Sequence, residues 1–199
     1  MIGMEYDKII KYFKDNTALV SMNKIDEFFN RIPADDRMMV ETFMRTELGL
    51  NVFDYITIIP EKMFAYNSDL KTIVIPSTIE DIERNAFEGC SASSIAIEAQ
   101  IWELKEATFS NCKSLSEVSL PSTLTTIDKD AFRNCTSLKE ITLPKNIEDI
   151  KSGAFRGCET TLEKMALPME QVKKGLLKMN KSGVEGEFFR KVCRQSYMY

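Results

Sequence analysis

Apolar and polar positions recur at a regular interval along the middle of the chain. The sequence numbers of five phenylalanines differ by 23, 22, 23 and 23, and a cysteine stands three positions after each of the last four. Asn67 takes the place of the cysteine in the first copy. A fixed period of this kind predicts a stack of repeats rather than one globular core. The two sets are Phe64, Phe87, Phe109, Phe132 and Phe155, and Cys90, Cys112, Cys135 and Cys158.

Each copy predicts a short strand followed by a turn. The pattern Leu-x-x-Ile-x-Leu-Pro at residues 138–144 places two apolar side chains on one face of an extended segment. The proline ends the strand because it has no N–H to donate. Ile147 and Ile150 follow, and then comes the next Ala-Phe-x-x-Cys, which we expect to form a short 3₁₀ or helical turn. Such a unit is too small to bury its own apolar edge, so the copies should stack into a solenoid.

The motif resembles the BspA-like (treponemal-type) class of leucine-rich repeat, whose repeating unit carries Ala-Phe-x-x-Cys and Leu-x-x-Ile-x-Leu-Pro. The resemblance covers about residues 49–168, with about five repeats. It implies an α/β solenoid, namely a right-handed leucine-rich repeat superhelix with short parallel strands, flanked by an N-terminal helical cap and a C-terminal helical cap.

Copies at the margins of this array are irregular. The second copy is one residue short, with Ser93 or Ala92 in place of the usual leucine. An extra residue near 160–161 shifts the apolar positions of the fifth copy by one. We therefore expect local changes in curvature, particularly near residues 90–103. A degenerate opening copy is visible in Leu50, Val52, Ile56 and Ile59.

The two ends predict helical caps, because exposed terminal repeats would leave an apolar cross-section in water. Residues 1–48 carry three amphipathic patterns, and residues 169–199 carry two. The third pattern runs from about Asp35 to Leu48, with Gly49 as its stop. The inward positions are Tyr6, Ile9, Ile10 and Phe13; Ile25, Phe28, Phe29 and Ile32; Met39, Val40, Phe43 and Met44; Val172, Leu176, Leu177 and Met179; and Phe188, Phe189 and Val192.

Composition narrows the possible chemistry. The chain has no histidine, which excludes Ser-His-Asp or Cys-His catalysis and imidazole metal ligands. With 26 basic and 30 acidic residues, net −4, it lacks the basic surface of a nucleic-acid binder. We expect no enzyme activity, no cofactor and no nucleic-acid partner. Residues 169–199 carry 7 basic and 3 acidic residues, which favours a solvated helical face over a docking element for an acidic partner.

The cysteine column is not spaced like a metal site. Zinc sites usually pair cysteines close together in sequence, whereas here each thiol comes from a different repeat. Buried free thiols are favoured over a metal site or a disulfide between neighbours, and Cys193 is interpreted as helix packing. Ser21-Met-Asn-Lys24 matches the Ser-x-x-Lys of penicillin-binding enzymes, but the supporting Ser-Asp-Asn is missing. Ser21 is therefore interpreted as a helix cap.

The remaining candidate site is the concave face of the predicted sheet, because extended concave faces of solenoids bind other macromolecules. Its side chains are mostly small, and Glu117 is expected to stack beside Glu140, either through duplication or to bind a basic group. The predicted partner-binding residues are Thr72, Val74, Ser94, Ala96, Glu117, Ser119, Glu140, Thr142, Lys164 and Ala166.

These features predict a non-catalytic module that binds a protein or peptide partner through its concave sheet. One alternative is a structural component of a larger assembly, such as a virion or secretion apparatus, that contacts its neighbours through the caps. Another is an adhesin-like surface protein exported without a recognisable signal.

Location is predicted from the missing targeting signals. Charged residues from Glu5 to Lys11 interrupt any secretory apolar stretch, and no run approaches the ~20 apolar residues needed to span a bilayer. We expect a cytoplasmic monomer or weak oligomer with no membrane partner, or alternatively a virion or extracellular location reached by a non-classical route.

Overall fold

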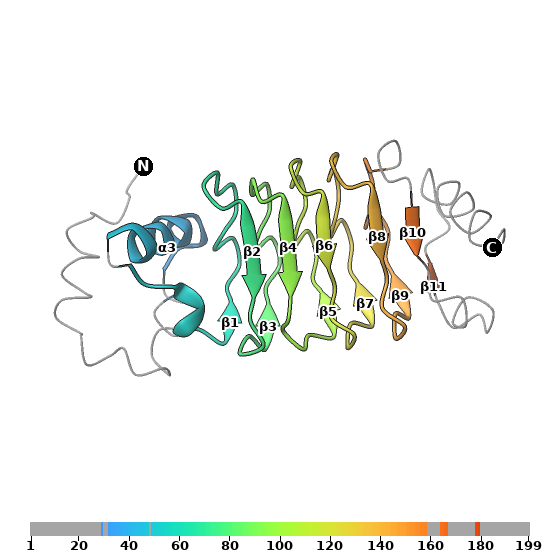
Figure 1. Ribbon diagram of the computed structural model, residues 1–199, viewed down its shortest axis with the longest axis horizontal. Coiled ribbons are helices and arrows are strands. Elements are labelled where there is room, and N and C mark those ends of the chain that lie inside the picture. The colour runs from blue at the N-terminus through green and yellow to red at the C-terminus, as the bar shows by residue number, and fades with distance from the viewer. Residues whose placement is uncertain (1–28, 30–31, 48, 159–163, 167–177, 180–199) are drawn as a thin grey trace.

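The repeats stack as successive turns of a solenoid (Figure 1). The structure, a computed structural model, describes residues 29, 32–47, 49–158, 164–166 and 178–179. Helix α3 (Ala34–Glu47) covers the N-terminal end of the stack, next to the 3₁₀ turn η2 (Val52–Asp54). The predicted solenoid with parallel strands is therefore confirmed.

The strands lie in two rows: the first turn contributes a strand to the second row only, and each later turn contributes one strand to each row. Every strand pair in the described residues is parallel. The first row holds the predicted strands: β2 (Thr72–Ile75), β4 (Ser94–Ile97), β6 (Glu117–Ser119), β8 (Glu140–Thr142) and β10 (Lys164–Ala166). The second row was not predicted: β1 (Ile58–Ile59), β3 (Asp81–Ile82), β5 (Glu103–Leu104), β7 (Thr126–Ile127), β9 (Asp149–Ile150) and β11 (Lys178–Met179).

Within the described residues, the pairing between neighbouring strands is interrupted once in each row. The first row forms the sheets β2-β4-β6 and β8-β10, and the second forms β1-β3 and β5-β7-β9-β11. Both irregular copies still keep register. Ala92 is fully buried where other copies have leucine, whereas Ser93 is exposed. Met165, rather than Lys164, pairs with Ile141, which confirms the predicted extra residue in the fifth copy.

The aromatic and thiol columns form the core. The five phenylalanine rings form one stack, and the centroids of neighbouring rings are 4.9–5.5 Å apart. The four cysteines beside them are buried and free. Three of these thiols donate hydrogen bonds of 3.0–3.2 Å to a phenylalanine carbonyl of the preceding turn. These are Cys112 to Phe87, Cys135 to Phe109 and Cys158 to Phe132.

The predicted helical or 3₁₀ turn around each phenylalanine is wrong. The positions two before and two after the ring have a left-handed backbone, with φ between 56° and 82°. A left-handed residue cannot continue a right-handed helix, so its N–H bonds the next turn instead, as Asn111 N–H does to the Arg133 carbonyl at 2.6 Å. The described repeats are thus strands and turns, and the fold is a β-solenoid rather than an α/β solenoid. The left-handed pairs are Lys62 and Tyr66, Asn85 and Gly89, Ala107 and Asn111, Asp130 and Asn134, and Gly153 and Gly157.

The N-terminal cap is confirmed for its third helix. Gly49 has φ +64°, and Val40, Phe43 and Met44 are buried as predicted. Met39 is 37% exposed, so its inward placement is wrong. The buried face of α3 is rotated toward Glu41, which hydrogen-bonds the first repeat. The first two predicted helices lie outside the described residues, apart from Phe29 and Ile32, which are buried.

The C-terminal cap is described only at Lys178–Met179, and the predicted helix is wrong at these two residues. They form β11, which pairs with β9 and continues the second row, because the ladder groups of Asp149 and Ile150 accept a further strand there. The remaining cap positions and Cys193 lie outside the described residues, and the division at 48/49 and 168/169 stays a prediction. In the described part of the chain no helix has the length and apolar character needed to cross a membrane.

Candidate protein-interaction surface

The first strand row presents the predicted site residues outward. In β2, Thr72 and Val74 are exposed while the alternating Ile73 and Ile75 are buried, and β8 follows the same alternation. In β4 the outward residues are half-buried. The register aligns Thr72 with Ser94 and Glu117, and Val74 with Ala96 and Ser119. The two parallel lines of side chains are confirmed as geometry for β2, β4 and β6, and their role in binding a partner stays a prediction.

The C-terminal part of this row forms a separate sheet. Glu140 pairs in register with Lys164, and Thr142 pairs with Ala166. Strands β6 and β8 lie on adjacent turns, but the pairing between strands stops there (Figure 1). Glu117 and Glu140 therefore belong to neighbouring turns without the strand pairing that their expected stacking assumed. The side chains of Lys164 and Ala166 are not among those described.

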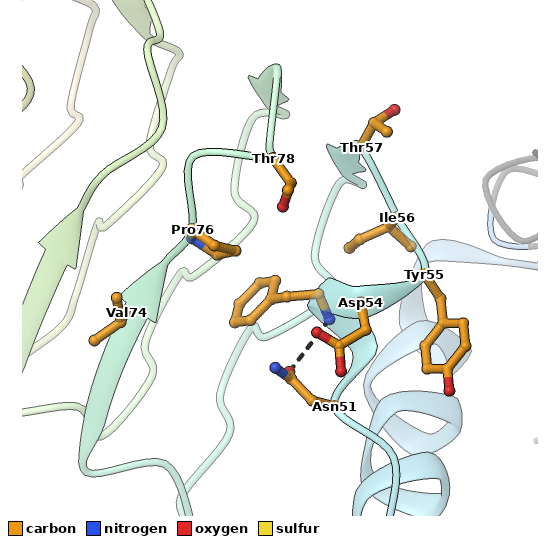
Figure 2. Close-up of a pocket in the computed structure, with 9 residues that line it drawn as sticks. Asn51, Asp54, Tyr55, Ile56, Thr57, Val74, Pro76 and Thr78 are labelled. Carbon is orange, nitrogen blue, oxygen red and sulfur yellow. Dashed lines mark hydrogen bonds between the residues drawn. The ribbon is translucent and has the colours of Figure 1, made fainter. Parts of the chain in front are cut away.

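A groove of about 710 Å³ opens at the N-terminal end of this face, between η2 and β2 (Figure 2). Val74 and Pro76 line it on the β2 side, and Asp54 and Ile56 line the opposite side. Asp54 is the one charged residue among the nine that line it. Sequence reasoning missed the groove, although the degenerate opening copy was its signal. The lining residues are Asn51, Phe53, Asp54, Tyr55, Ile56, Thr57, Val74, Pro76 and Thr78.

The groove exists because the first turn pairs with the second turn as a strand in the second row but not in the first row. Where other copies form a strand, the Asn51 side chain accepts a hydrogen bond from Phe53 N–H at 3.3 Å and caps the 3₁₀ turn η2. On the opposite side the turns do close, since Glu80 N–H donates to the Thr57 carbonyl at 2.7 Å. The gap between η2 and β2 is thus a wedge whose narrow end is the β1-β3 pair.

A buried polar cluster joins the cap to the first repeat, and sequence reasoning also missed it. Glu41 is 3% exposed; it accepts hydrogen bonds from Asn67 Nδ2 at 3.3 Å and from Arg45 Nε at 3.2 Å. Burial raises the pKa of the Glu41 carboxyl, and the Arg45 guanidinium opposes that rise. The side-chain oxygen Oδ1 of Asn67 accepts from the N–H groups of Asp69 and Leu70. Asn67 thus replaces cysteine where the column meets the cap.

The second strand row carries charges that are paired between turns. Lys105 Nζ lies 2.5 Å from Asp81 and 2.8 Å from Glu83, across the point where β3 and β5 are not paired as strands. Burial lowers the pKa of Lys105, but the hydrogen bonds that its ammonium donates to the two carboxylates outweigh this effect, so the pKa is raised. Lys151 similarly lies 3.3 Å from Asp128. The charges of this face therefore stabilise the stack itself.

The four thiols of the column are buried, and the contact with Cys112 lowers the pKa of the Cys90 thiol. Cys90 Sγ and Cys112 Sγ lie 3.6 Å apart in the core. The contact with Cys90, together with burial, raises the pKa of the Cys112 thiol, and Cys158 and burial do the same for Cys135. These two thiols stay protonated at neutral pH. Among the residues that the structure describes, no group of three or more Cys, Asp or Glu side chains is placed to hold a metal ion.

Three solved structures share this fold. A leucine-rich cell surface protein from Faecalibacterium prausnitzii is 28% identical, with a TM-score of 0.58 over 65% of this chain and 34% of its own. A leucine-rich repeat protein from Bacteroides ovatus is 32% identical, with a TM-score of 0.54 over 57% of this chain and 30% of its own. The Treponema pallidum leucine-rich repeat protein is 31% identical, with a TM-score of 0.53 over 58% of this chain and 54% of its own.

The comparisons agree on the repeat. The chain spans about a third of the Faecalibacterium and Bacteroides proteins and about half of the Treponema protein. No curated protein matches it. The sequence profile of the BspA-type leucine-rich repeat region matches residues 41–175, in six copies. That match covers more than half of the sequence and includes every phenylalanine of the column, so the chain belongs to the BspA-type leucine-rich repeat family.

Proposed function

We propose that this protein is a non-catalytic interaction module that binds a protein or peptide partner through the first strand row. The observation that carries the proposal is the contrast between the two rows. On the second row, Lys105 and Lys151 are engaged by carboxylates of neighbouring turns. On the first row, Thr72, Val74 and the residues aligned with them face outward along adjacent turns.

The chemistry of the first row suggests what kind of partner it takes. Ser94, Ala96 and Ser119 are small, so a partner backbone could approach the strands closely. Val74, 47% exposed, adds apolar surface next to the groove at one end. The exposed carboxylate Glu117 lies further along the row. A segment with an apolar anchor and a basic side chain fits this arrangement.

The test uses two double variants of exposed glutamates. Replacing Glu117 and Glu140 by alanine changes the first row, and replacing Glu80 and Glu148 by alanine changes equally exposed acids beside the second row. Partners are captured from the native source with both variants and the unchanged protein, and the dissociation constant of each purified partner is then measured.

We expect the first pair to weaken binding about tenfold, which is typical of removing interface charges, and the second to leave it within twofold. Equal binding by all three proteins, or loss only with the second pair, would contradict the proposal. Circular dichroism of the variants checks that each is folded.

A cell-surface setting is the second part of the proposal, and the similarity to the Faecalibacterium cell surface protein favours it. Protease treatment of intact cells of the native source tests it. Digestion of the protein on intact cells supports a surface location, and protection until the cells are lysed places it inside.

A further inference from the structure

We propose that the open edge of β2 binds an extended peptide segment as an added strand, anchored by an apolar side chain in the groove beside it. This inference rests on the proposed function, because it names the place on the first row where a peptide partner would pair. It also assigns an occupant to the groove, which binding along the rest of the first row would not use.

The direction of the β2 peptide groups follows from its contacts with β4. Ser94 N–H donates to the Lys71 carbonyl at 3.4 Å, and Glu98 N–H donates to the Ile75 carbonyl at 2.9 Å. Peptide groups alternate in direction along a strand, so those of Thr72 and Val74 point away from β4 and toward η2. No backbone hydrogen bond of the described residues joins Thr72 or Val74 to the first turn. Within the described residues, β2 is thus an edge strand on the side that faces the first turn.

The opening copy leaves this edge open because of its own local structure. In β4 and β6 the preceding strand covers the equivalent edge in register. Here residues 52–54 turn away as η2, and the Phe53 ring packs on Phe64 at 5.4 Å. The edge remains open while the second row is closed by β1 and β3. The wedge therefore combines unpaired ladder groups with an adjoining cavity.

The lining of the groove defines the chemistry of the occupant. Its volume of about 710 Å³ lies within the roughly 300–1,000 Å³ of pockets that hold ligands. Phe53, Val74 and Pro76 supply apolar walls, and Asp54 supplies the charge. Strand addition takes its affinity from main-chain hydrogen bonds and its specificity from pockets for alternate side chains. The occupant is therefore an extended peptide with an apolar residue for the groove and a basic residue for Asp54.

The length of the added strand is limited. Pro76 follows β2 and has no N–H, so pairing ends there. β2 is four residues long, which at about 3.3 Å per residue corresponds to roughly 13 Å of strand. A segment of about four to six residues is enough to cover the edge.

The test selects peptides from a displayed library of random dodecapeptides against the full-length protein and measures their affinity by calorimetry. Val74→Lys places a charge beside the groove, and Ala96→Lys places the same charge on the next strand at the paired position. Both positions face outward, so both variants should fold. We expect Val74→Lys to weaken the selected peptides at least tenfold and Ala96→Lys to change them less than twofold.

A second measurement reports pairing directly. In an added strand, every second amide of the peptide faces β2. N-methylation of the amides that face β2 should abolish binding, and N-methylation of the other set should leave binding intact. Hydrogen exchange of the Thr72 and Val74 amides should slow at least tenfold when the peptide binds. Failure to select any peptide, or binding that N-methylation in neither frame affects, would overturn the proposal.

The outcomes also separate this inference from the proposed function. If peptides are weakened by Ala96→Lys or by loss of Glu117 and Glu140 but not by Val74→Lys, the strand face binds and the edge does not. If the amides of Thr72 and Val74 are already protected in the dilute free protein, another part of this chain covers the edge. If their protection rises with protein concentration together with the mass in solution, a second copy covers it. Each of these three results overturns strand addition by a peptide partner.

Discussion

Replacing Ala107 by glycine should stabilise the protein, which is unusual for an alanine-to-glycine change. Ala107 has φ +56°, in the left-handed region. A side chain there costs about 1–2 kcal/mol, which glycine avoids. Glycine also gives the unfolded chain more conformational freedom, which lowers the free energy of unfolding by about 0.5–1 kcal/mol. The net gain should therefore be about 0.5–1 kcal/mol in the free energy of unfolding.

The contacts of Ala107 support this magnitude. Its N–H donates to the Lys129 carbonyl at 3.0 Å, and glycine keeps that bond. The same position is Lys62 in the first turn, and in the other three turns it is Asn85, Asp130 or Gly153, which are residue types that tolerate a left-handed backbone. Alanine has neither a polar side chain for local hydrogen bonding nor the freedom of glycine.

Urea unfolding followed by far-ultraviolet circular dichroism measures the difference, and an unchanged slope with denaturant shows that the comparison is valid. Ala96→Gly in β4 is the matched control, and it should lose about 0.5–1 kcal/mol because its backbone is extended. Gly157→Ala is the reverse change; its new Cβ would collide with Asn134 Oδ1, so it should lose more than about 1 kcal/mol. If Ala107→Gly loses stability as Ala96→Gly does, the left-handed turn at this position is refuted.

Three further predictions test the core and the cap. Phe132→Ala should lower the free energy of unfolding by about 3–5 kcal/mol, because it leaves a cavity between two stacked rings; a loss below about 1 kcal/mol in urea unfolding would contradict the aromatic column. The raised pKa of Glu41 means that its contribution to stability is present below 4.5, the ordinary value, and is lost as pH rises through the folded value. The free energy of unfolding of Glu41→Gln, relative to that of the unchanged protein, should therefore be higher at pH 7 than at pH 4. The opposite trend would contradict the burial of this carboxyl. Cys112 and Cys135 should react with maleimide only after unfolding, as peptide mass analysis would show, and rapid labelling of the native protein would exclude their burial.

The columns of the core could be predicted because one interval along the sequence becomes one step along the solenoid. The regular spacing of the phenylalanines translates directly into stacked rings, as Phe87, Phe109 and Phe132 show. The outward direction of Thr72 and Val74 followed in the same way from alternation about a buried isoleucine. Both inferences needed only local periodicity and the requirement that apolar side chains leave water.

The remaining features depend on contacts between parts of the chain that periodicity does not describe. The second strand row consists of two-residue strands, which are too short to show alternation. The left-handed turns use Ala107 and Tyr66 as well as asparagine and glycine, so residue type alone did not mark them. The apolar pattern of the third cap helix does not include the charged Glu41, whose burial depends on Asn67 of the first repeat. The groove at η2 depends on a single side-chain cap by Asn51.

The ion pairs of the second strand row help to set the order in which the turns of the solenoid stack. The phenylalanine and cysteine columns are nearly identical in every turn, so an apolar core alone does not distinguish the adjacent turn from the one beyond it. Ion pairs do distinguish them. At each of four successive junctions, an acid of one turn lies 2.8–3.4 Å from a base of the next. These pairs are Glu61 with Arg84, Glu83 with Lys105, Glu106 with Lys129, and Asp128 with Lys151.

These residues occupy two neighbouring repeat positions, one holding Glu83, Lys105, Asp128 and Lys151 and the other Glu61, Arg84, Glu106 and Lys129. The sign of the charge alternates from turn to turn at each position, so skipping one turn would place Glu83 against Asp128 and Arg84 against Lys129. Each exposed pair contributes only about 0.2–1 kcal/mol, too little to hold the fold together, yet each replaces a repulsion of similar size in the skipped arrangement. The charges of the second row thus specify the order of the turns, while the aromatic column supplies their cohesion. A partner that bound to the second row would have to compete with these pairs. The first row carries no comparable ladder in β2, β4 and β6, where Thr72, Ser94 and Glu117 share one line, and a partner can bind there without breaking the contacts that set the order of the stack.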